Sequence, residues 1–344
     1  MAEFISFQPT DYFLTHTYSG NSSTNNQTVG LTPAFTWVKS RNTASPTQHY
    51  LIDAVRGNEK YIISNSNAAE ATDSETFELV ANGFNLAGGN GWTNLSGRTY
   101  VSWNWKGGTT SVPSGGPITP SACSFDATSG FGAYAYTGTA TNGTIAHGLG
   151  KVPGMILVKQ LSGTEAWRVY HQNINAEDYL VLNTTAEWVT EAANWNSTAA
   201  TSTVFSIGTD TSVNSSGGTF IAYVFANVPG FLRCGKYKGN GDADGTFIYT
   251  GFRPAYFMCK KASASGGSWA IYDNKREGYN AGNSYLEANA QDADDSADQI
   301  DIVSNGIKLR TTGGYQNTSG ATYIYAAFAE FPIVSSNNIP TVAR

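Results

Sequence analysis

The stretch Pro33-Ala-Phe-Thr-Trp-Val-Lys39 decides how this chain is read, because its pattern returns as Pro153-Gly-Met-Ile-Leu-Val-Lys159 and Pro254-Ala-Tyr-Phe-Met-Cys-Lys260. A Tyr-x-Gly turn precedes each run, and an Asn-x-Ser-Gly turn that leads into an aromatic strand follows it. The spacing from the proline to the asparagine of that turn is 61, 61 and 63 residues. This recurrence predicts a tandem array of three similar units.

Short apolar runs punctuated by turn residues fill each predicted unit. Aromatic and β-branched runs bounded by Gly, Asn, Ser and Thr indicate strands and turns. About six short alternating strands at regular spacing are typical of two packed antiparallel sheets. We therefore predict an all-β fold of three tandem antiparallel β-sandwich repeats, jelly-roll-like or immunoglobulin-like.

Changes in composition indicate where the units begin and end. The Gly-, Ser- and Pro-rich stretch after the first unit is typical of a linker with little to bury. In the last strand of the third unit, around Tyr323, both faces carry large apolar groups, which indicates a central or covered strand and favours an oligomer. The predicted organisation is an N-terminal arm (1–13), repeat 1 (14–106), a linker (107–130), repeat 2 (131–228), repeat 3 (229–331) and a C-terminal tail (332–344).

Composition and charge exclude several classes of function. Charged residues make up 13% of the chain, the formal net charge is −6 and no Lys/Arg cluster is visible in the sequence, which argues against nucleic-acid binding. The N-terminus lacks the pattern of a secretory signal, and no apolar run approaches the ~20 residues that span a bilayer. The three cysteines, Cys123, Cys234 and Cys259, have no metal-like spacing, so we expect no disulfide and no cofactor.

The recurring acidic residues are the first catalytic candidates. Asp53 and Asp273 are each followed three residues later by an arginine, Arg56 or Arg276. Such a pair at equivalent positions of two units favours an ion pair that fixes a turn. The second unit has His171 and Asn173 there, the four histidines do not recur, and no nucleophile motif is present. We therefore predict no catalytic residue and no enzyme activity.

One turn resembles the first half of a calcium loop. Asn240, Asp242 and Asp244 place oxygen ligands at alternate positions before a glycine, which makes them the candidate metal ligands. The twelfth position, which needs an acidic ligand, is Gly251. A hairpin tip without metal is the preferred interpretation, because Asn, Asp and Gly also serve tight turns.

Three tryptophans are the candidate binding residues. Trp92, Trp188 and Trp195 fall in segments without aromatic equivalents in the other units, in the stretches 88–93 and 187–196. Flat aromatic faces bind sugars and protein partners. The alternative is that each ring folds back onto its own sandwich.

Five stretches of the sequence carry a resemblance to known proteins: Phe7-Gln-Pro-Thr-Asp-Tyr-Phe13, Asp53-Ala-Val-Arg-Gly57, Ala68-Ala-Glu-Ala-Thr-Asp73, Gly148-Leu-Gly-Lys-Val-Pro153 and Gly320-Ala-Thr-Tyr-Ile-Tyr-Ala-Ala-Phe-Ala-Glu330. They resemble a family of proteins encoded by marine tailed bacteriophages that infect cyanobacteria and abundant ocean bacteria. The resemblance covers the chain from Phe7 to Arg344. It implies a tail-fibre-like or virion structural protein of unassigned role, and the family offers no catalytic residues to transfer.

We therefore expect a virion protein that is assembled in the host cytoplasm and works by binding. The favoured function is a tail-associated fibre or host-recognition component, built as a homo-oligomer, with a trimer expected. Its expected partners are other virion proteins and a host glycan or receptor, with no nucleic acid and no membrane insertion. The alternatives are a capsid decoration or head-fibre protein and, from a different class, an envelope polysaccharide depolymerase, which would need a carboxylate pair facing a groove.

Overall fold

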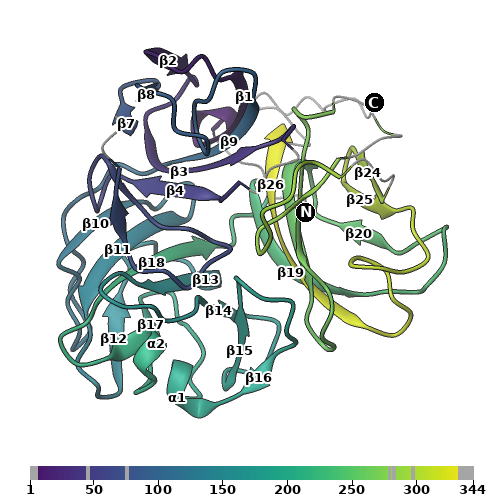
Figure 1. The fold of residues 1–344 in the computed structure, drawn as a ribbon. Helices are drawn as coiled ribbons and strands as arrows, with labels where there is room; N and C mark the ends of the chain where they lie inside the picture. Colours follow the sequence, from purple (N-terminus) through teal and green to yellow (C-terminus); the bar gives the residue numbers. More distant parts are fainter. Residues whose placement is uncertain are drawn as a thin grey trace.

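The protein is an all-β molecule made of antiparallel sheets packed as sandwiches, so the predicted all-β sandwich class is confirmed, and the three tandem repeats stay a prediction (Figure 1). The computed structural model describes residues 7–43, 47–73, 77–277, 280, 284–295 and 299–331. The predicted tail, 332–344, and the first six residues of the predicted arm lie outside this range. We call β1–β9 unit 1, β10–β18 unit 2 and β19–β26 unit 3.

Unit 1 packs a four-stranded sheet of order β1-β9-β3-β4 against a three-stranded sheet of order β2-β8-β7. Tyr18, Tyr50 and Phe84 lie between the two sheets, each buried. A 3-10 turn, η1 (Pro9–Asp11), leads into the unit. Its strands are β1 (Phe13–Ser19), β2 (Asn25–Thr28), β3 (Pro33–Ser40), β4 (Tyr50–Asp53), β5 (Lys60–Tyr61), β6 (Ala71–Thr72), β7 (Phe77–Val80), β8 (Gly83–Leu86) and β9 (Thr99–Lys106).

Unit 2 has a seven-stranded sheet of order β10-β11-β18-β13-β14-β15-β16, which faces the pair β12-β17. Two short helices, α1 (Ala192–Trp195) and α2 (Thr211–Asn214), connect its later strands. The strands are β10 (Ala122–Asp126), β11 (Phe131–Thr137), β12 (Gly143–Ala146), β13 (Pro153–Gln160), β14 (Arg168–His171), β15 (Asp178–Val181), β16 (Val189–Thr190), β17 (Val204–Ile207) and β18 (Thr219–Ala226).

Unit 3 packs a five-stranded sheet of order β19-β26-β21-β22-β23 against a three-stranded sheet of order β20-β25-β24. Its strands are β19 (Leu232–Lys238), β20 (Phe247–Tyr249), β21 (Arg253–Lys261), β22 (Trp269–Asp273), β23 (Leu286–Glu287), β24 (Ile300–Val303), β25 (Gly306–Leu309) and β26 (Thr322–Phe331). In the larger sheet of every unit, a long closing strand (β9, β18 or β26) lies between an opening strand and the Pro-to-Lys strand.

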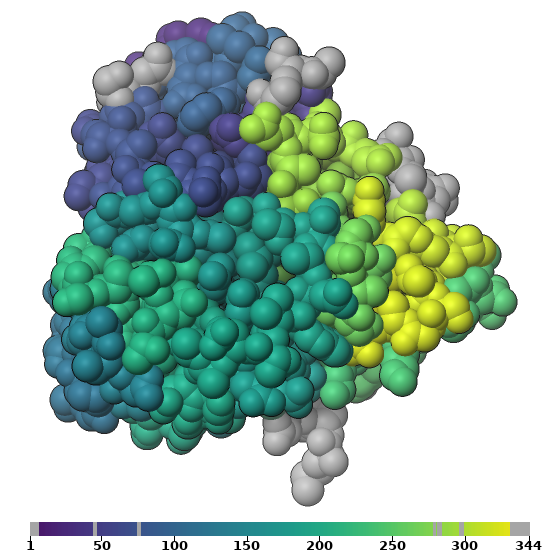
Figure 2. Space-filling model, turned by 60° about the horizontal axis from the view of Figure 1, so that its bottom comes forward, coloured from purple at the N-terminus to yellow at the C-terminus, as the bar shows by residue number. Residues whose placement is uncertain are grey.

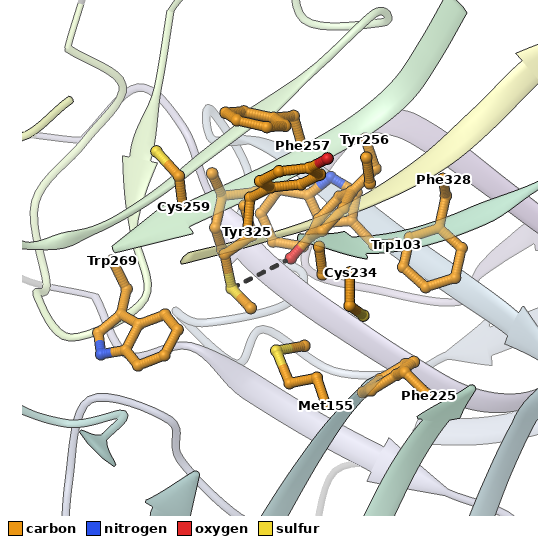
Figure 3. Close-up of a cluster of buried hydrophobic side chains, with 14 of the residues drawn as sticks. Trp103, Met155, Phe225, Cys234, Tyr256, Phe257, Cys259, Trp269, Tyr325 and Phe328 are labelled. Carbon is orange, nitrogen blue, oxygen red and sulfur yellow. Dashed lines mark hydrogen bonds between the residues drawn. The ribbon is translucent and has the colours of Figure 1, made fainter. Parts of the chain in front are cut away.

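The three closing strands meet in one aromatic cluster at the centre of the molecule. Trp105, Phe225 and Phe328 occupy matching positions, because each pairs with the third residue of its Pro-to-Lys strand. Their ring centroids lie 5.6 to 6.0 Å apart in all three pairs. The units therefore surround a shared core (Figure 3), and they adjoin one another on the surface shown in Figure 2.

This arrangement explains why both faces of each closing strand are apolar. One face of each closing strand packs inside its own sandwich, and the other contributes to the central cluster of the same chain. The apolar second face from which we expected an oligomer is thus covered by neighbouring units, without a second subunit.

The predicted linker is wrong in one respect. Residues 107–130 include β10, which pairs with β11 and extends the unit 2 sheet. Ile118, Cys123 and Phe125 are buried in the unit 2 core. The high Gly, Ser and Pro content led to the linker prediction, but burial of these few apolar side chains is enough to hold the segment against the sandwich.

Candidate functional site

The recurring acidic residues form buried ion pairs within their own units, and each also accepts a hydrogen bond from a neighbouring unit. Asp53 accepts hydrogen bonds from the Arg56 Nε at 2.6 Å and from the Tyr223 hydroxyl of unit 2 at 2.6 Å. Its other oxygen accepts from the backbone N–H of Val55 and Arg56. Glu70 lies 3.3 Å from the same guanidinium. Every oxygen of Asp53 is therefore engaged, as expected for an ion pair that fixes a turn.

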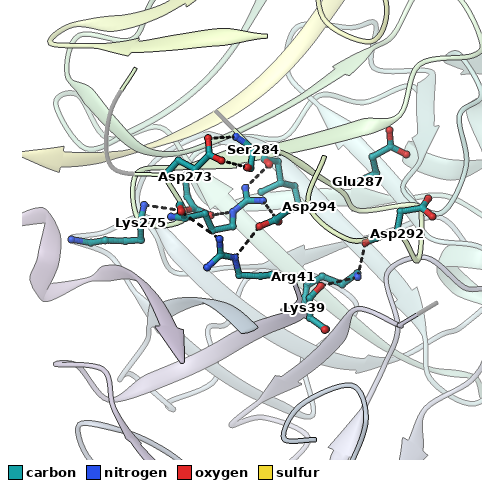
Figure 4. A network of polar contacts seen from close by, with 12 residues as sticks. Lys39, Arg41, Asp273, Lys275, Ser284, Glu287, Asp292 and Asp294 are labelled. Carbon is teal, nitrogen blue, oxygen red and sulfur yellow. Dashed lines mark hydrogen bonds and ion pairs between the residues drawn. The ribbon is translucent and has the colours of Figure 1, made fainter. Parts of the chain in front are cut away.

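Asp273 repeats this geometry in unit 3. Its Oδ2 accepts from Arg276 Nε at 2.6 Å and from the indole N–H of Trp103 in unit 1 at 3.0 Å. Asp294 binds Arg276 at 2.8 Å and Arg41 of unit 1 at 2.8 Å (Figure 4). A buried carboxylate with all its partners supplied by the fold suits a structural joint, not acid–base chemistry.

His171 takes the corresponding place in unit 2. Its Nδ1 accepts from the Asn173 backbone N–H at 3.3 Å, and its Nε2 donates to the Tyr325 carbonyl of unit 3 at 3.2 Å. Burial lowers the pKa of His171 to about 4. A neutral imidazole thus replaces the carboxylate and still connects two units.

A second set of matching contacts joins the units in the same cyclic order. The indole N–H of Trp167 in unit 2 donates to the Ile63 carbonyl of unit 1 at 2.9 Å. The indole N–H of Trp269 in unit 3 donates to the Val181 carbonyl of unit 2 at 3.0 Å. The His49 Nε2 of unit 1 donates to the backbone carbonyl of Glu287 in unit 3 at 2.9 Å. Unit 2 thus contacts unit 1, unit 3 contacts unit 2 and unit 1 contacts unit 3, which closes a ring.

The lysines that end the Pro-to-Lys strands are buried beside these junctions. Lys39, Lys159 and Lys260 are each 0% exposed, and each ammonium donates to the carbonyl of the following residue. Lys39 also donates to the backbone carbonyls of Gln291 and Asp292 in unit 3 (Figure 4). Burial lowers the pKa of Lys39 and Lys260 to about 7 and that of Lys159 to about 8. Their carbonyl partners indicate a structural role.

The three candidate tryptophans lie in different surroundings. Trp195 belongs to α1, is 1% exposed and packs edge-on against Tyr170, with centroids 5.8 Å apart. The expectation that it offers a binding face is therefore wrong: a four-residue helix turns it into the unit 2 core. Trp92 is half-buried and packs edge-on against Tyr61, with centroids 5.9 Å apart, so it folds back on its own sandwich.

Trp188 marks a junction between units. Its backbone N–H donates to the Ala262 carbonyl of unit 3 at 2.9 Å, and its half-buried ring packs against the shared core. Matching backbone hydrogen bonds occur at the other two junctions. The Glu70 N–H of unit 1 donates to the Leu161 carbonyl of unit 2, and the Asp294 N–H of unit 3 donates to the Arg41 carbonyl of unit 1. The sequence places Trp188 in a loop without an aromatic counterpart. In the structure it stands at a contact between units, in the position that Glu70 and Asp294 hold at the other two junctions.

The calcium-like turn is organised by its own hydrogen bonds. The Asn240 side-chain oxygen accepts from Asp242 N–H at 3.1 Å and from the Asn317 amide at 2.9 Å. Asp242 caps the N–H of Asp244, which in turn pairs with Lys308 at 2.6 Å. Among the described residues, no group of three His, Cys, Asp or Glu side chains is placed to hold a metal.

The smaller sheet of unit 3 carries an exposed aromatic surface that the sequence comparison missed. Phe247 and Tyr249 are 45% and 51% exposed, while Ile248 between them is buried. Both rings therefore point away from the sandwich, along a strand that lies at the sheet edge. Arg233 of β19 places its guanidinium 5.5 Å from the centre of the Tyr249 ring. We call Phe247, Tyr249 and Arg233 the β20 surface.

Among the residues that the structure describes in units 1 and 2, the matching places carry no aromatic pair. By sheet register, Asn26 and Thr28 of β2 occupy the places of Phe247 and Tyr249, and both are exposed. In unit 2 these places fall to Thr144 and Ala146. The missed signal was an aromatic at both outward positions of Phe247-Ile-Tyr249, where the matching strand of unit 1 is polar.

The fold and these junctions define an all-β protein whose three sandwich units close around one core. Residues 8–332 match the family described as "Domain of unknown function (DUF7483)", and because the match covers most of the chain, the protein belongs to this family. A search of curated proteins finds no match. Within the described residues, no helix has the length and apolar character to cross a membrane.

Proposed function

We propose that this chain is a bacteriophage virion protein exposed on the particle, a tail-associated fibre or host-recognition component that works by binding. The resemblance of its sequence stretches to marine phage proteins supports this assignment. So does a fold held together by packing and polar junctions, with all three cysteines buried and free.

The observation that carries the binding role is the exposed pair Phe247 and Tyr249. Exposed large aromatics side by side on a rigid strand are uncommon on a protein surface unless something binds there. They also lie where the units differ, whereas the residues that the units share build the junctions. The acids Asp53 and Asp273 are buried in ion pairs, so they do not support a depolymerase.

Assembly into a homo-oligomer, with a trimer expected, remains part of the proposal. The apolar faces of the closing strands are already covered, so a contact between subunits must use an outer surface. Binding to other virion proteins, on the tail or on the capsid, is subject to the same restriction.

Labelling of intact particles tests the proposal. An antibody against this chain, imaged by electron microscopy on virions of the encoding phage, is expected to mark the tail tip or fibres. Labelling at the capsid lattice would favour the decoration-protein alternative. Absence of the chain from purified virions would overturn the proposal.

A further inference from the structure

Phe247 and Tyr249 of the β20 surface belong to a sheet face that mixes apolar and polar side chains. Cross-strand neighbours share a face, so Phe247 lies beside Lys308, and Tyr249 lies beside Gly306. On the next strand, Asp301 follows Lys308 and Val303 follows Gly306. Gly306 has no side chain, and the Phe247 ring leans over it, since a Cβ at this position would stand 3.1 Å from Phe247 Cε2.

This face combines two kinds of contact that a sugar ring uses. A pyranose has an apolar face of C–H groups, which packs on the negative face of an aromatic ring. Its hydroxyls lie at the rim, where they need donors and acceptors. Here the rim is formed by Lys308, paired with Asp244, and by Asp301, paired with Arg310.

Arg233 adds a positive charge to this surface. It is exposed, and no ion pair to it occurs among the described residues, whereas Lys308 and Arg310 each have a carboxylate partner. Its guanidinium lies over one face of the Tyr249 ring and beside the Tyr325 hydroxyl, so the other face of Tyr249 and the Phe247 ring are the aromatic faces left for a ligand. Such a fork binds a carboxylate through two parallel hydrogen bonds, as it also does a phosphate.

We propose that the β20 surface binds an acidic saccharide, with sugar rings packed on Phe247 and Tyr249 and a sugar carboxylate paired with Arg233. This inference rests on the proposed binding function and names the class of its ligand. Within the described residues, the matching strands of units 1 and 2 lack the aromatic pair, so we expect one molecule of protein to bind one saccharide segment.

The test uses the purified full chain and calorimetric titration with oligomers of galacturonic, glucuronic and sialic acid, each beside its methyl-esterified form. We expect at least one acidic oligomer to bind with 1:1 stoichiometry. Esterification or Arg233→Gln should weaken it by about tenfold or more, because each removes a charge-assisted hydrogen-bonded pair. The double variant Phe247→Asn, Tyr249→Thr should abolish detectable binding.

The chain supplies its own control. Phe247→Asn and Tyr249→Thr install the residues that unit 1 carries at these positions, and the double variant Asn26→Ala, Thr28→Ala changes the matching strand without touching the site. The control variant should bind as the unchanged protein does, and all variants should keep their thermal midpoint.

No binding of any acidic oligomer, equal binding of the esterified forms, or self-association through β20 would each overturn the inference. Particle labelling is independent of these results, so a failure here leaves the virion assignment to be judged separately.

Discussion

The Trp103 indole N–H donates to Asp273 Oδ2 at 3.0 Å across 170 residues of chain, and the Tyr223 hydroxyl donates to Asp53 Oδ2 across the same separation. Trp103 and Tyr223 hold matching places on the closing strands of units 1 and 2. The same joint therefore connects unit 1 to unit 3 and unit 2 to unit 1. Long-range polar contacts of this kind make the units interdependent.

Removal of the Asp273 carboxylate should destabilise the whole protein. Asp273→Asn leaves Arg276 buried with one carboxylate partner fewer, and breaking a buried pair costs about 3–5 kcal/mol. Denaturant unfolding at neutral pH measures the loss as a lower midpoint. The control is Asp301→Asn, whose partner Arg310 is 47% exposed, and for which we expect a change of about 0.5 kcal/mol or less. Equal effects of the two variants would contradict a structural role for the buried pair.

The shared aromatic cluster predicts cooperative unfolding. Trp105, Phe225 and Phe328 come from three units, so none of the units can open without exposing the others' rings. Calorimetry should show one transition with equal calorimetric and van't Hoff enthalpies. Phe225→Ala should lower the stability of the entire molecule by about 3–5 kcal/mol. Separate transitions, with only one of them shifted by the variant, would contradict this view.

The sequence predicted strands, sandwich class and the recurring Asp–Arg pairs, because alternation and local spacing determine those features. It did not predict that the units close around a common core. From the sequence, Trp105 is predicted to be an aromatic residue of a strand, but the residues that cover it cannot be predicted. Its partners Phe225 and Phe328 are more than 100 residues away in the chain. Spatial closure is a property of unit packing, which local periodicity does not encode.

The candidate site was harder to predict for a related reason. Trp195 was selected because it lacked a counterpart, yet a short helix buries it, and Phe247 and Tyr249 were passed over as ordinary strand residues. Exposure depends on which strands become sheet edges. Only the register of β20 against β25 shows that both aromatics face outward.

The asparagine that recurs in the Asn-x-Ser-Gly turns should be sensitive to substitution in every unit. The Asn214 amide donates to the Thr141 and Gly208 carbonyls, at 2.7 and 2.6 Å, and its oxygen accepts from Thr139 N–H. Asn214→Ala removes all three bonds from a buried site and should cost about 1–3 kcal/mol. Asn94→Ala and Asn317→Ala should cost similar amounts, because their amides hold equivalent turns. A thermal-shift series on the three variants checks this, and an effect confined to one unit would contradict it.

The buried histidine predicts loss of stability in mild acid. The pKa of His171 is about 4 in the folded protein because of burial, whereas the unfolded value is near 6.5. As the pH falls below 6.5, the unfolded chain takes up a proton that the folded protein excludes, so stability falls progressively until about pH 4. One such group contributes up to about 3 kcal/mol over this range. Lys236 is the charged group that adds to the effect, and the neutral contact is the Tyr325 carbonyl.

Urea unfolding at pH 7, 6, 5 and 4.5 measures this dependence. His171→Asn should reduce the loss of stability between pH 6.5 and 4.5, because the amide keeps an acceptor and a donor but does not titrate. His49, whose pKa burial also lowers, should retain its share of the slope in that variant. An unchanged slope in His171→Asn would contradict the assignment, whereas a lower midpoint at pH 7 with a flatter slope agrees with it.

The buried lysines predict how stability changes on the alkaline side of neutral pH. Lys39, Lys159 and Lys260 have folded pKa values of about 7 to 8 because of burial, while the unfolded value is near 10.5. Between these values the unfolded chain holds more protons, so stability should rise from pH 7 toward pH 10. Buried tyrosines such as Tyr136, whose pKa burial raises well above 10, should reverse the trend beyond pH 10. Lys159→Met, at a lysine with two oxygen partners against four for Lys39, should flatten the rise between pH 8 and 10, and a profile as steep as that of the unchanged protein would contradict this account.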